Sequence, residues 1–341
     1  MKITIRKWQA AALGLLCWAI VANAQTRFVQ ITDPHIFDSD QVRKGESLSK
    51  SQRQVRTLDT ERAFINAVNF INRLVVQGAH FEFIVITGDL GLAHISYPPA
   101  QAAKRMKSWL AACKVMRFLF VPGNNDIGNS MEYIEKYREF IAALKKQMPN
   151  RVYEICSEPI EYTQGTLYIG HNSASYKYQH DKQLVELQAL RSLIASKTAS
   201  RIYLFSHIAG IDDPYLVYTN RPDSNQEYPF SAWGVSSQVR KLWYELLADP
   251  RVKAVFTGHF HIYQRSYYQK PFNWIRDNRY PQTVLDKTYL CPPISAKYQW
   301  EQSQRARGFQ IVTLDQQGDV STQVYWYERG RFAVARPTAD N

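Results

Sequence analysis

Short apolar runs alternate with longer stretches of helical spacing along most of this chain. Six runs rich in β-branched and aromatic residues, each closely followed by Gly, Asp, Asn or Ser, are typical of buried strands: residues 28–32, 83–87, 118–121, 167–170, 202–205 and 254–257. Apolar residues at a 3.6-residue spacing predict helices from about residue 59 to Gly78 and over residues 131–147, 181–196 and 236–248. Two further strand-like runs, 309–313 and 320–327, flank the turn signal Gly318-Asp319. The alternation of the two periods predicts a single layered α/β domain over residues 25–341.

Residues 1–24 differ from the rest of the chain. Lys2, Arg6 and Lys7 precede an apolar run at 10–22, and the small residues of Ala22-Asn23-Ala24 follow. This pattern predicts a secretory signal peptide that is removed, because the apolar run is shorter than the roughly 20 residues of a membrane-spanning helix. A retained membrane anchor is the alternative. We therefore expect a periplasmic or secreted protein with no membrane span after signal removal.

Composition and charge narrow the class of partner. The 341 residues are 45% hydrophobic and 21% charged, which is enough to bury a large core. The formal net charge of +12 favours an anionic partner, here a phosphorylated small-molecule or polymeric substrate, although general solubility also explains it. The basic residues form no long block, so no stable nucleic-acid partner is predicted. The densest group could clamp an anion over a cleft: Arg43, Lys44, Lys50, Arg53 and Arg56.

Three cysteines follow the predicted signal peptide: Cys113, Cys156 and Cys291. An exported protein can form disulfides, and an odd number allows one bridge and leaves at least one free thiol. The spacing does not select a pair and does not resemble a metal site. We assign these cysteines no chemistry.

Polar residues of three types gather where five of the predicted strands end. Since ligands of open α/β sheets bind at the carboxyl ends of strands, these groups could converge on one site. Each is an ordinary turn or core residue when taken alone. His259-Phe260-His261 is the strongest single signal, because residues i and i+2 of an extended segment share a face. The set is Asp33, His35, Asp89, Asn124, Asn125, Asp126, His207, His259 and His261.

In this order the motifs resemble the calcineurin-like metallophosphoesterase superfamily, whose pattern covers residues 28–261. The resemblance implies an α/β fold of two packed β-sheets flanked by helices, in four αββα layers. It also implies two metal sites that share Asp89. One would use Asp33, His35, Asp89 and His261, and the other would use Asp89, Asn124, His207 and His259.

The residue types suit the chemistry that this resemblance implies. Two divalent ions about 3.5 to 4 Å apart can polarise a phosphoryl group, and a bridging water becomes an attacking hydroxide because the ions lower its pKa. Imidazole and carboxylate suit Mn, Zn or Fe(II), and the sequence does not choose among them. Leu92 stands where purple acid phosphatases have the tyrosine that binds ferric iron, which argues against a ferric–tyrosinate site.

Asn125 departs from the pattern, because the family usually has a histidine after the asparagine ligand. That histidine acts near the substrate, and Asp126 stands at the position of its partner. An asparagine can donate a hydrogen bond but cannot deliver a proton. We name Asn125 and Asp126 as catalytic candidates, with Asp126 either orienting Asn125 or fixing the turn. Exported members that resemble acid sphingomyelinases or endopolyphosphatases also vary at this position.

The sequence thus predicts an exported dinuclear phosphoesterase. Its substrate could be a phosphodiester, a phosphomonoester or a phosphoanhydride. The alternative is a metal-binding recognition protein that keeps the fold and has lost turnover through Asn125. If another residue supplies the proton, His94 and His171 are the candidates, since each follows a strand-like run. The oligomeric state is left open.

Overall fold

The computed structural model describes residues 25–37, 60–127, 131–162, 165–174, 180–210, 237–261, 265–274, 280–295 and 307–334. The predicted signal peptide at 1–24 and the basic group between Arg43 and Arg56 lie outside the described residues. Within the described part, no helix combines the length and the apolar character that a membrane span requires.

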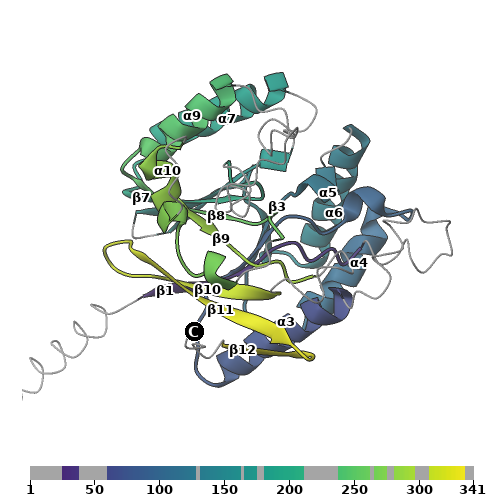
Figure 1. Cartoon of the computed structure of the whole chain (residues 1–341). Helices are drawn as coiled ribbons and strands as arrows, with labels where there is room; N and C mark the ends of the chain where they lie inside the picture. Colours follow the sequence, from purple (N-terminus) through teal and green to yellow (C-terminus); the bar gives the residue numbers. More distant parts are fainter. Residues whose placement is uncertain are drawn as a thin grey trace, which may run out of the picture.

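Two β-sheets form the centre of the fold (Figure 1). The larger has seven strands in the order β12 (Arg331–Val334), β11 (Val320–Glu328), β10 (Gly308–Leu314), β1 (Thr26–Ile31), β2 (Ile84–Thr87), β3 (Phe118–Val121) and β4 (Val152–Glu154). The smaller has five, in the order β5 (Ile160–Tyr162), β6 (Thr166–His171), β7 (Arg201–Ser206), β8 (Val252–Thr257) and β9 (Thr288–Leu290). Strands β1 to β4 are parallel, as are β6 to β9, so each sheet gathers the carboxyl ends of several strands at one edge.

Helices cover the outer face of each sheet (Figure 1). The larger sheet packs against α3 (Thr60–Val76), α4 (Pro99–Leu110) and α6 (Met131–Gln147), whose apolar faces join it in one core cluster. The smaller sheet packs against α7 (His180–Ser196), α9 (Ser237–Ala248) and α10 (Gln282–Lys287) in a second cluster. A third apolar cluster lies between the sheets. The predicted arrangement of two packed sheets flanked by helices is confirmed.

Strand β1 shows how the layers form. Val29 and Ile31 face the helices, while Phe28 faces the smaller sheet, because successive side chains of a strand point to opposite faces. The ring centroid of Phe28 lies 4.8 Å from that of Phe83, 5.6 Å from Phe205 and 5.3 Å from Phe256. We call the rings that join the two sheets here the aromatic cluster: Phe28, Phe83, Tyr168, Phe205 and Phe256.

The predicted strands and helices are all present, and their ends differ from the predictions by at most two residues. Helices α4 and α10 were not predicted, and neither were the four strands that form the sheet edges, β4, β5, β9 and β12. The three described cysteines are free, so the disulfide that the sequence allowed does not form; Cys113 and Cys291 are buried and Cys156 is half-buried.

Candidate metal centre

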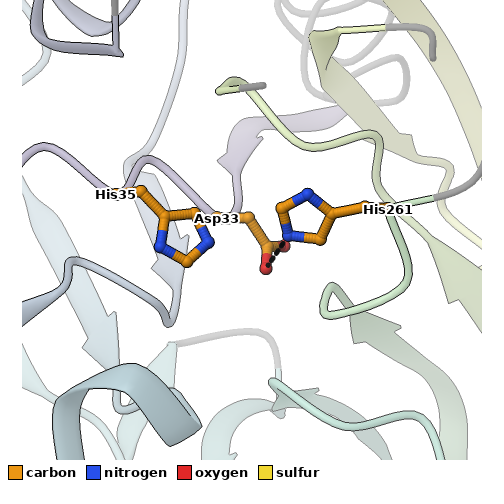
Figure 2. Close-up of side chains that lie close together, drawn as sticks. All are labelled: Asp33, His35 and His261. Carbon is orange, nitrogen blue, oxygen red and sulfur yellow. Dashed lines mark hydrogen bonds and ion pairs between the residues drawn. The ribbon is translucent and has the colours of Figure 1, made fainter. Parts of the chain in front are cut away.

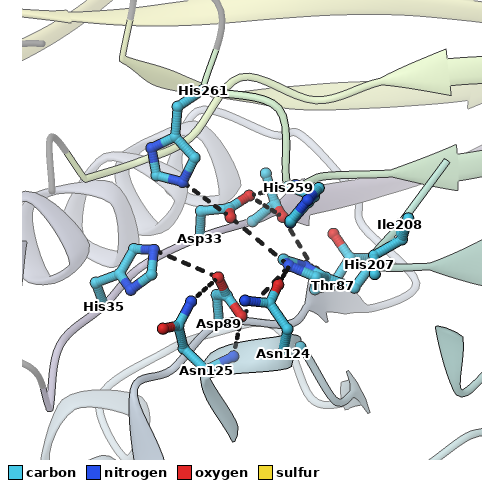
Figure 3. Close-up of polar contacts among 12 residues, drawn as sticks. Asp33, His35, Thr87, Asp89, Asn124, Asn125, His207, Ile208, His259 and His261 are labelled. Carbon is cyan, nitrogen blue, oxygen red and sulfur yellow. Dashed lines mark hydrogen bonds and ion pairs between the residues drawn. The ribbon is translucent and has the colours of Figure 1, made fainter. Parts of the chain in front are cut away.

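Five loops bring the predicted ligands together at the edge where the two sheets meet (Figure 3). The loops follow β1, β2, β3, β7 and β8, which are the five strand ends that the sequence singled out. Backbone bonds tie adjacent loops together: the Asp33 amide donates to the Gly88 carbonyl at 3.1 Å, and the His35 amide donates to the Asp89 carbonyl at 2.8 Å. All seven predicted ligands therefore lie in one site.

One group of possible ligand atoms consists of Asp33, His35 and His261 (Figure 2). Their atoms lie within 4.8 Å of one another. The Nε2 atom of His261 is 3.1 Å from Oδ1 of Asp33. The imidazoles of His35 and His261 lie on either side of the Asp33 carboxylate, so a cation there would have ligands on more than one side.

A second group consists of Asp33, Asp89 and His207. The Nδ1 atom of His207 lies 2.8 Å from the Thr87 carbonyl, and a carbonyl only accepts, so Nδ1 carries the hydrogen. Nε2 then faces Oδ1 of Asp89 at 3.3 Å and the amide oxygen of Asn124 at 3.0 Å. In neutral His207 this nitrogen carries a lone pair that points at two oxygen acceptors. A cation bound between the nitrogen and the two oxygens would satisfy all three atoms.

Asp89 lies between the two groups, and its two oxygens face different histidines. Oδ1 faces His207, while Oδ2 is 3.6 Å from Nε2 of His35 (Figure 3). Asp33 belongs to both groups by distance, but only its Oδ1 faces histidine rings, with His261 at 3.1 Å and His207 at 4.0 Å. The orientation of its oxygens makes Asp89 the residue suited to join two ions.

The electrostatics of the site favour positive charge. Burial raises the pKa of Asp33, but His261 and His207 outweigh burial and hold it well below its usual range. For His207, burial lowers the pKa, but the negative charges of Asp89 and Asp33 raise it to about 9. Burial, followed by the neighbouring His207, lowers the pKa of His259 to about 3, so that imidazole is neutral and able to bind a metal. Buried carboxylates require a compensating cation, and the imidazole, carboxylate and amide ligands fit a divalent one.

The backbone of the site is strained. Seven described residues other than glycine have positive φ, and four of them are predicted ligands: Asp33 (50°), His35 (45°), Asp89 (59°) and His259 (71°). Such conformations cost about 1–3 kcal/mol each and cluster at functional sites. Gly88 also has φ 88°, and a Cβ there would lie 2.6 Å from Nδ1 of His207, so no other residue fits without moving a ligand.

Asn125 binds the carboxylate of Asp89 with two donors. Its backbone amide donates to Oδ1 at 2.8 Å, and its side-chain amide donates to Oδ2 at 2.6 Å. Both donors sit at the start of the short helix α5 (Asn124–Ile127). The side chain that replaces the expected histidine is therefore directed at the Asp89 carboxylate.

Asp126 is fully buried and binds backbone amides on two loops. Its Oδ2 accepts from Gly123 at 2.9 Å, and its Oδ1 accepts from Gly91 at 3.0 Å and from Leu92 at 3.2 Å. Burial, followed by the charge of Asp89, raises its pKa to about 7, although the backbone amides act in the opposite direction. Of the two roles expected for Asp126, this geometry is that of fixing the turn.

The two alternative proton donors lie in different surroundings. The His94 backbone belongs to the 3-10 turn η2 (Leu92–His94), and its side chain is outside the described part. His171 is buried, with its ring stacked on Trp243 of α9 at 5.0 Å, and burial lowers its pKa to about 3. His171 is thus packed as a core residue.

Several residues that support the ligands were not predicted from the sequence. The Thr32 hydroxyl donates to Oδ2 of Asp33 at 2.7 Å, and the Ser295 hydroxyl donates to the backbone carbonyl of Asp33 at 2.6 Å. Gln30 and Gln310, on the neighbouring strands β1 and β10, are fully buried. The available signal was a polar residue within an apolar strand pattern, as in Phe28-Val-Gln-Ile-Thr32.

Comparison with known protein families gives one match. The family model described as Calcineurin-like phosphoesterase matches residues 26–263, which include every predicted ligand. Comparison with curated proteins gives no match.

Comparison with solved structures gives distant similarities. Purple acid phosphatase PPD1 from yellow lupin (Lupinus luteus) seeds is 12% identical with a TM-score of 0.48; the match covers 91% of this chain and 53% of the lupin chain, so this chain spans about half of that enzyme. A cold-active protein-tyrosine phosphatase of a psychrophilic Shewanella species is 11% identical with a TM-score of 0.31, covering 88% of this chain and 80% of that one. At these values the similarities carry no argument about activity.

Proposed function

Because the chain belongs to the calcineurin-like phosphoesterase family, we propose that this metal-dependent phosphoric ester hydrolase uses two divalent ions. Asp33, His35, Asp89 and His261 would hold one ion, and Asp89, Asn124, His207 and His259 the other. The single observation that carries the proposal is the position of Asp89. Its two oxygens face His35 in one group and His207 in the other.

The ions, which we propose to be Mn, Zn or Fe(II), would polarise the phosphoryl group and lower the pKa of a bound water. The protein contributes by holding its ligands in place before substrate arrives. Asn125 holds both oxygens of Asp89, and Asp126 holds the turn that carries Asn124 and Asn125. His207 is oriented by the Thr87 carbonyl, which keeps Nε2 directed at the centre.

Neither catalytic candidate is suited to protonate a leaving group. Asn125 has no acidic proton, and Asp126 is enclosed by backbone amides. We therefore propose that the substrates are anionic phosphoesters or phosphoanhydrides whose leaving group departs without a general acid. Activated aryl esters and phosphoanhydrides would be hydrolysed much faster than alkyl esters. The excess of basic residues in the sequence supports an anionic substrate.

The test is a screen of Mn-loaded protein against monoesters, diesters, nucleoside polyphosphates and polyphosphate, with Asp89→Asn measured on each substrate that is cleaved. Asp89→Asn should lower kcat/KM at least about 10³-fold, because a shared metal ligand supports several kcal/mol of transition-state stabilisation. The control is Asp319→Asn, in an exposed turn, which should act as wild type. Activity that survives in Asp89→Asn would refute this site, and wild-type inactivity with every metal would favour the recognition protein.

We also propose that the protein is exported, with residues 1–24 removed. Support comes from the sequence alone, namely the basic residues, the apolar run and the Ala22-Asn23-Ala24 segment. Sequencing the amino terminus of the protein recovered from its native cells tests this. We expect Gln25 as the first residue, and a chain that keeps residue 1 or 2 would contradict export by this signal.

A further inference from the structure

Gln30 is a buried polar residue between the aromatic cluster and the candidate metal centre. Strand β1 directs Phe28 into the aromatic cluster, and two residues further on it directs Gln30 toward the same side. Two residues beyond that, Thr32 binds the Asp33 carboxylate. An amide buried at this depth is costly unless it is hydrogen-bonded, so its partners indicate its role.

The hydrogen bonds of Gln30 reach both sheets. Its Nε2 donates to the Thr87 hydroxyl of β2 at 3.0 Å and to the Thr257 carbonyl of β8 at 3.2 Å. Its Oε1 accepts from Nε2 of Gln310, the residue opposite it on β10, at 2.6 Å. Because the Thr257 carbonyl can only accept, the NH₂ group of Gln30 must face it, and Gln310 must then present its own NH₂ to Gln30.

Both segments that Gln30 joins lead directly to metal ligands. Thr87 precedes Gly88-Asp89, and its carbonyl accepts from Nδ1 of His207 at 2.8 Å and lies 3.0 Å from the hydroxyl oxygen of Thr32. Thr257 precedes Gly258-His259, and the Gly258 amide donates to the His207 carbonyl at 3.0 Å. Gln30 thus links the strand end that carries Asp89 to the strand end that carries His259.

We propose that Gln30, held by Gln310, is a positioning residue that sets the spacing between the ligands of the two sheets. The inference rests on the proposed dinuclear centre, in which the larger sheet supplies Asp33, His35, Asp89 and Asn124 and the smaller supplies His207, His259 and His261. Each ion needs ligands from both sheets. A shift between the β2 and β8 ends would move the two halves of each site relative to one another.

The test replaces Gln30 with methionine, which has similar size and flexibility but no donor. Metal-free protein is titrated with Mn²⁺ by calorimetry, and hydrolysis is measured over a range of Mn²⁺ concentrations. We expect Gln30→Met to bind at least one Mn²⁺ about 10- to 100-fold more weakly, as is typical when a residue supporting a metal ligand is lost. Activity should fall at low Mn²⁺ and recover at saturating Mn²⁺, a recovery that general destabilisation would not give.

Phe28→Leu is the matched control, since Phe28 lies on the same strand and faces the same layer but packs among the apolar residues between the sheets. It should leave Mn²⁺ affinity unchanged. Gln310→Met keeps Gln30 but removes the hydrogen bond that Gln310 donates to it, so it should lower Mn²⁺ affinity by a smaller factor. This variant replaces Gln30→Met in the test if Gln30→Met does not fold. Wild-type Mn²⁺ affinity in the folded Gln30 or Gln310 variant would overturn the positioning role alone. A wild-type protein that binds fewer than two Mn²⁺ would overturn the dinuclear function and this inference with it.

Discussion

The space between the two sheets contains two regions of opposite character, built on the same strands. In the aromatic cluster, Phe28 contacts rings of both sheets, and the contacts are apolar and largely edge-to-face. A few residues further along, Gln30, Asp89 and His207 fill the same layer with hydrogen bonds and charge. Strand β1 passes from one region to the other as Phe28, Gln30 and Thr32.

The aromatic cluster contributes to stability, whereas the polar region carries the residues for chemistry. Each aromatic pair contributes about 0.5–1.5 kcal/mol beyond the area that it buries. The polar region carries costs, since four candidate ligands have left-handed backbone and three carboxylates, those of Asp33, Asp89 and Asp126, are buried. We infer that the aromatic cluster holds the sheets together firmly enough for the polar region to keep this strained geometry. The predictions below separate the two regions.

The largest effect on stability should come from Phe28→Ala. Truncating a fully buried phenylalanine should lower the free energy of unfolding by about 3–5 kcal/mol. In the fraction that remains folded, Mn²⁺ affinity should be unchanged, because the ring of Phe28 packs against aromatic rings between the sheets. Denaturant unfolding and calorimetry measure the two quantities. The control is Val185→Ala, at an α7 side chain that is 63% exposed, with an expected change within ~0.5 kcal/mol. A parallel loss of metal affinity in Phe28→Ala would mean that the two regions are not separable.

Asn125→His should change the chemistry with little change in stability. Wild-type rates should depend steeply on leaving-group pKa, since no positioned acid protonates the departing oxygen. The histidine should flatten this dependence if its ring reaches that oxygen, with a gain on alkyl esters toward the lower end of the about 10²- to 10⁴-fold that a general acid supplies. Specificity constants for a graded leaving-group series measure it. Asn125→Ala removes the side-chain contact with Asp89 without adding an acid, so it should not flatten the slope. A shallow wild-type slope would show that another residue supplies the proton.

The smallest effect should come from His171, which belongs to the core. Its pKa is about 3 in the folded protein and 6.5 in the unfolded chain, so the unfolded state binds the extra proton between these values. Stability therefore falls as the pH drops below about 6.5, by up to about 1.4 kcal/mol per pH unit from this residue. His171→Phe should reduce the slope of unfolding free energy between pH 7 and 5 and leave the leaving-group dependence unchanged. If His171→Phe left the pH dependence of the unfolding free energy unchanged, or altered the leaving-group dependence, His171 would not be a core residue without a catalytic role.

The sequence predicted the elements whose signal is local. Strands β1, β2, β3, β7 and β8 are largely buried on both faces, so each appears as a mainly apolar run, interrupted in β1 only by the buried Gln30. The edge strands are short and partly exposed, and they give weak patterns. Helix α4 starts at Pro99 after the N-cap Pro98, and its buried residues include the small Ala102 and Ala103 just before Lys104 and Arg105, so its apolar pattern is weak.

The candidate ligands could be named from the sequence because five motifs occur in a recognisable order, whereas the residues that support them have no such signal. Gln30 and Gln310 are 280 residues apart in the sequence, and Ser295 and Asp33 are 262 apart. Nothing local pairs them, since the contact exists only once β10 lies beside β1 and the segment after β9 reaches the Asp33 loop. The orientation of Asn125 toward Asp89 likewise depends on the meeting of two separate loops.

The most direct test of the dinuclear centre is to count the ions that activity requires. Metal-free protein is titrated with Mn²⁺ while bound metal is measured by mass spectrometry and hydrolysis of bis-p-nitrophenyl phosphate is followed. The account predicts no hydrolysis without metal and full activity at about two ions per chain, because each oxygen of Asp89 faces a different ligand group. Saturation at about one ion, or hydrolysis by the metal-free protein, would contradict it.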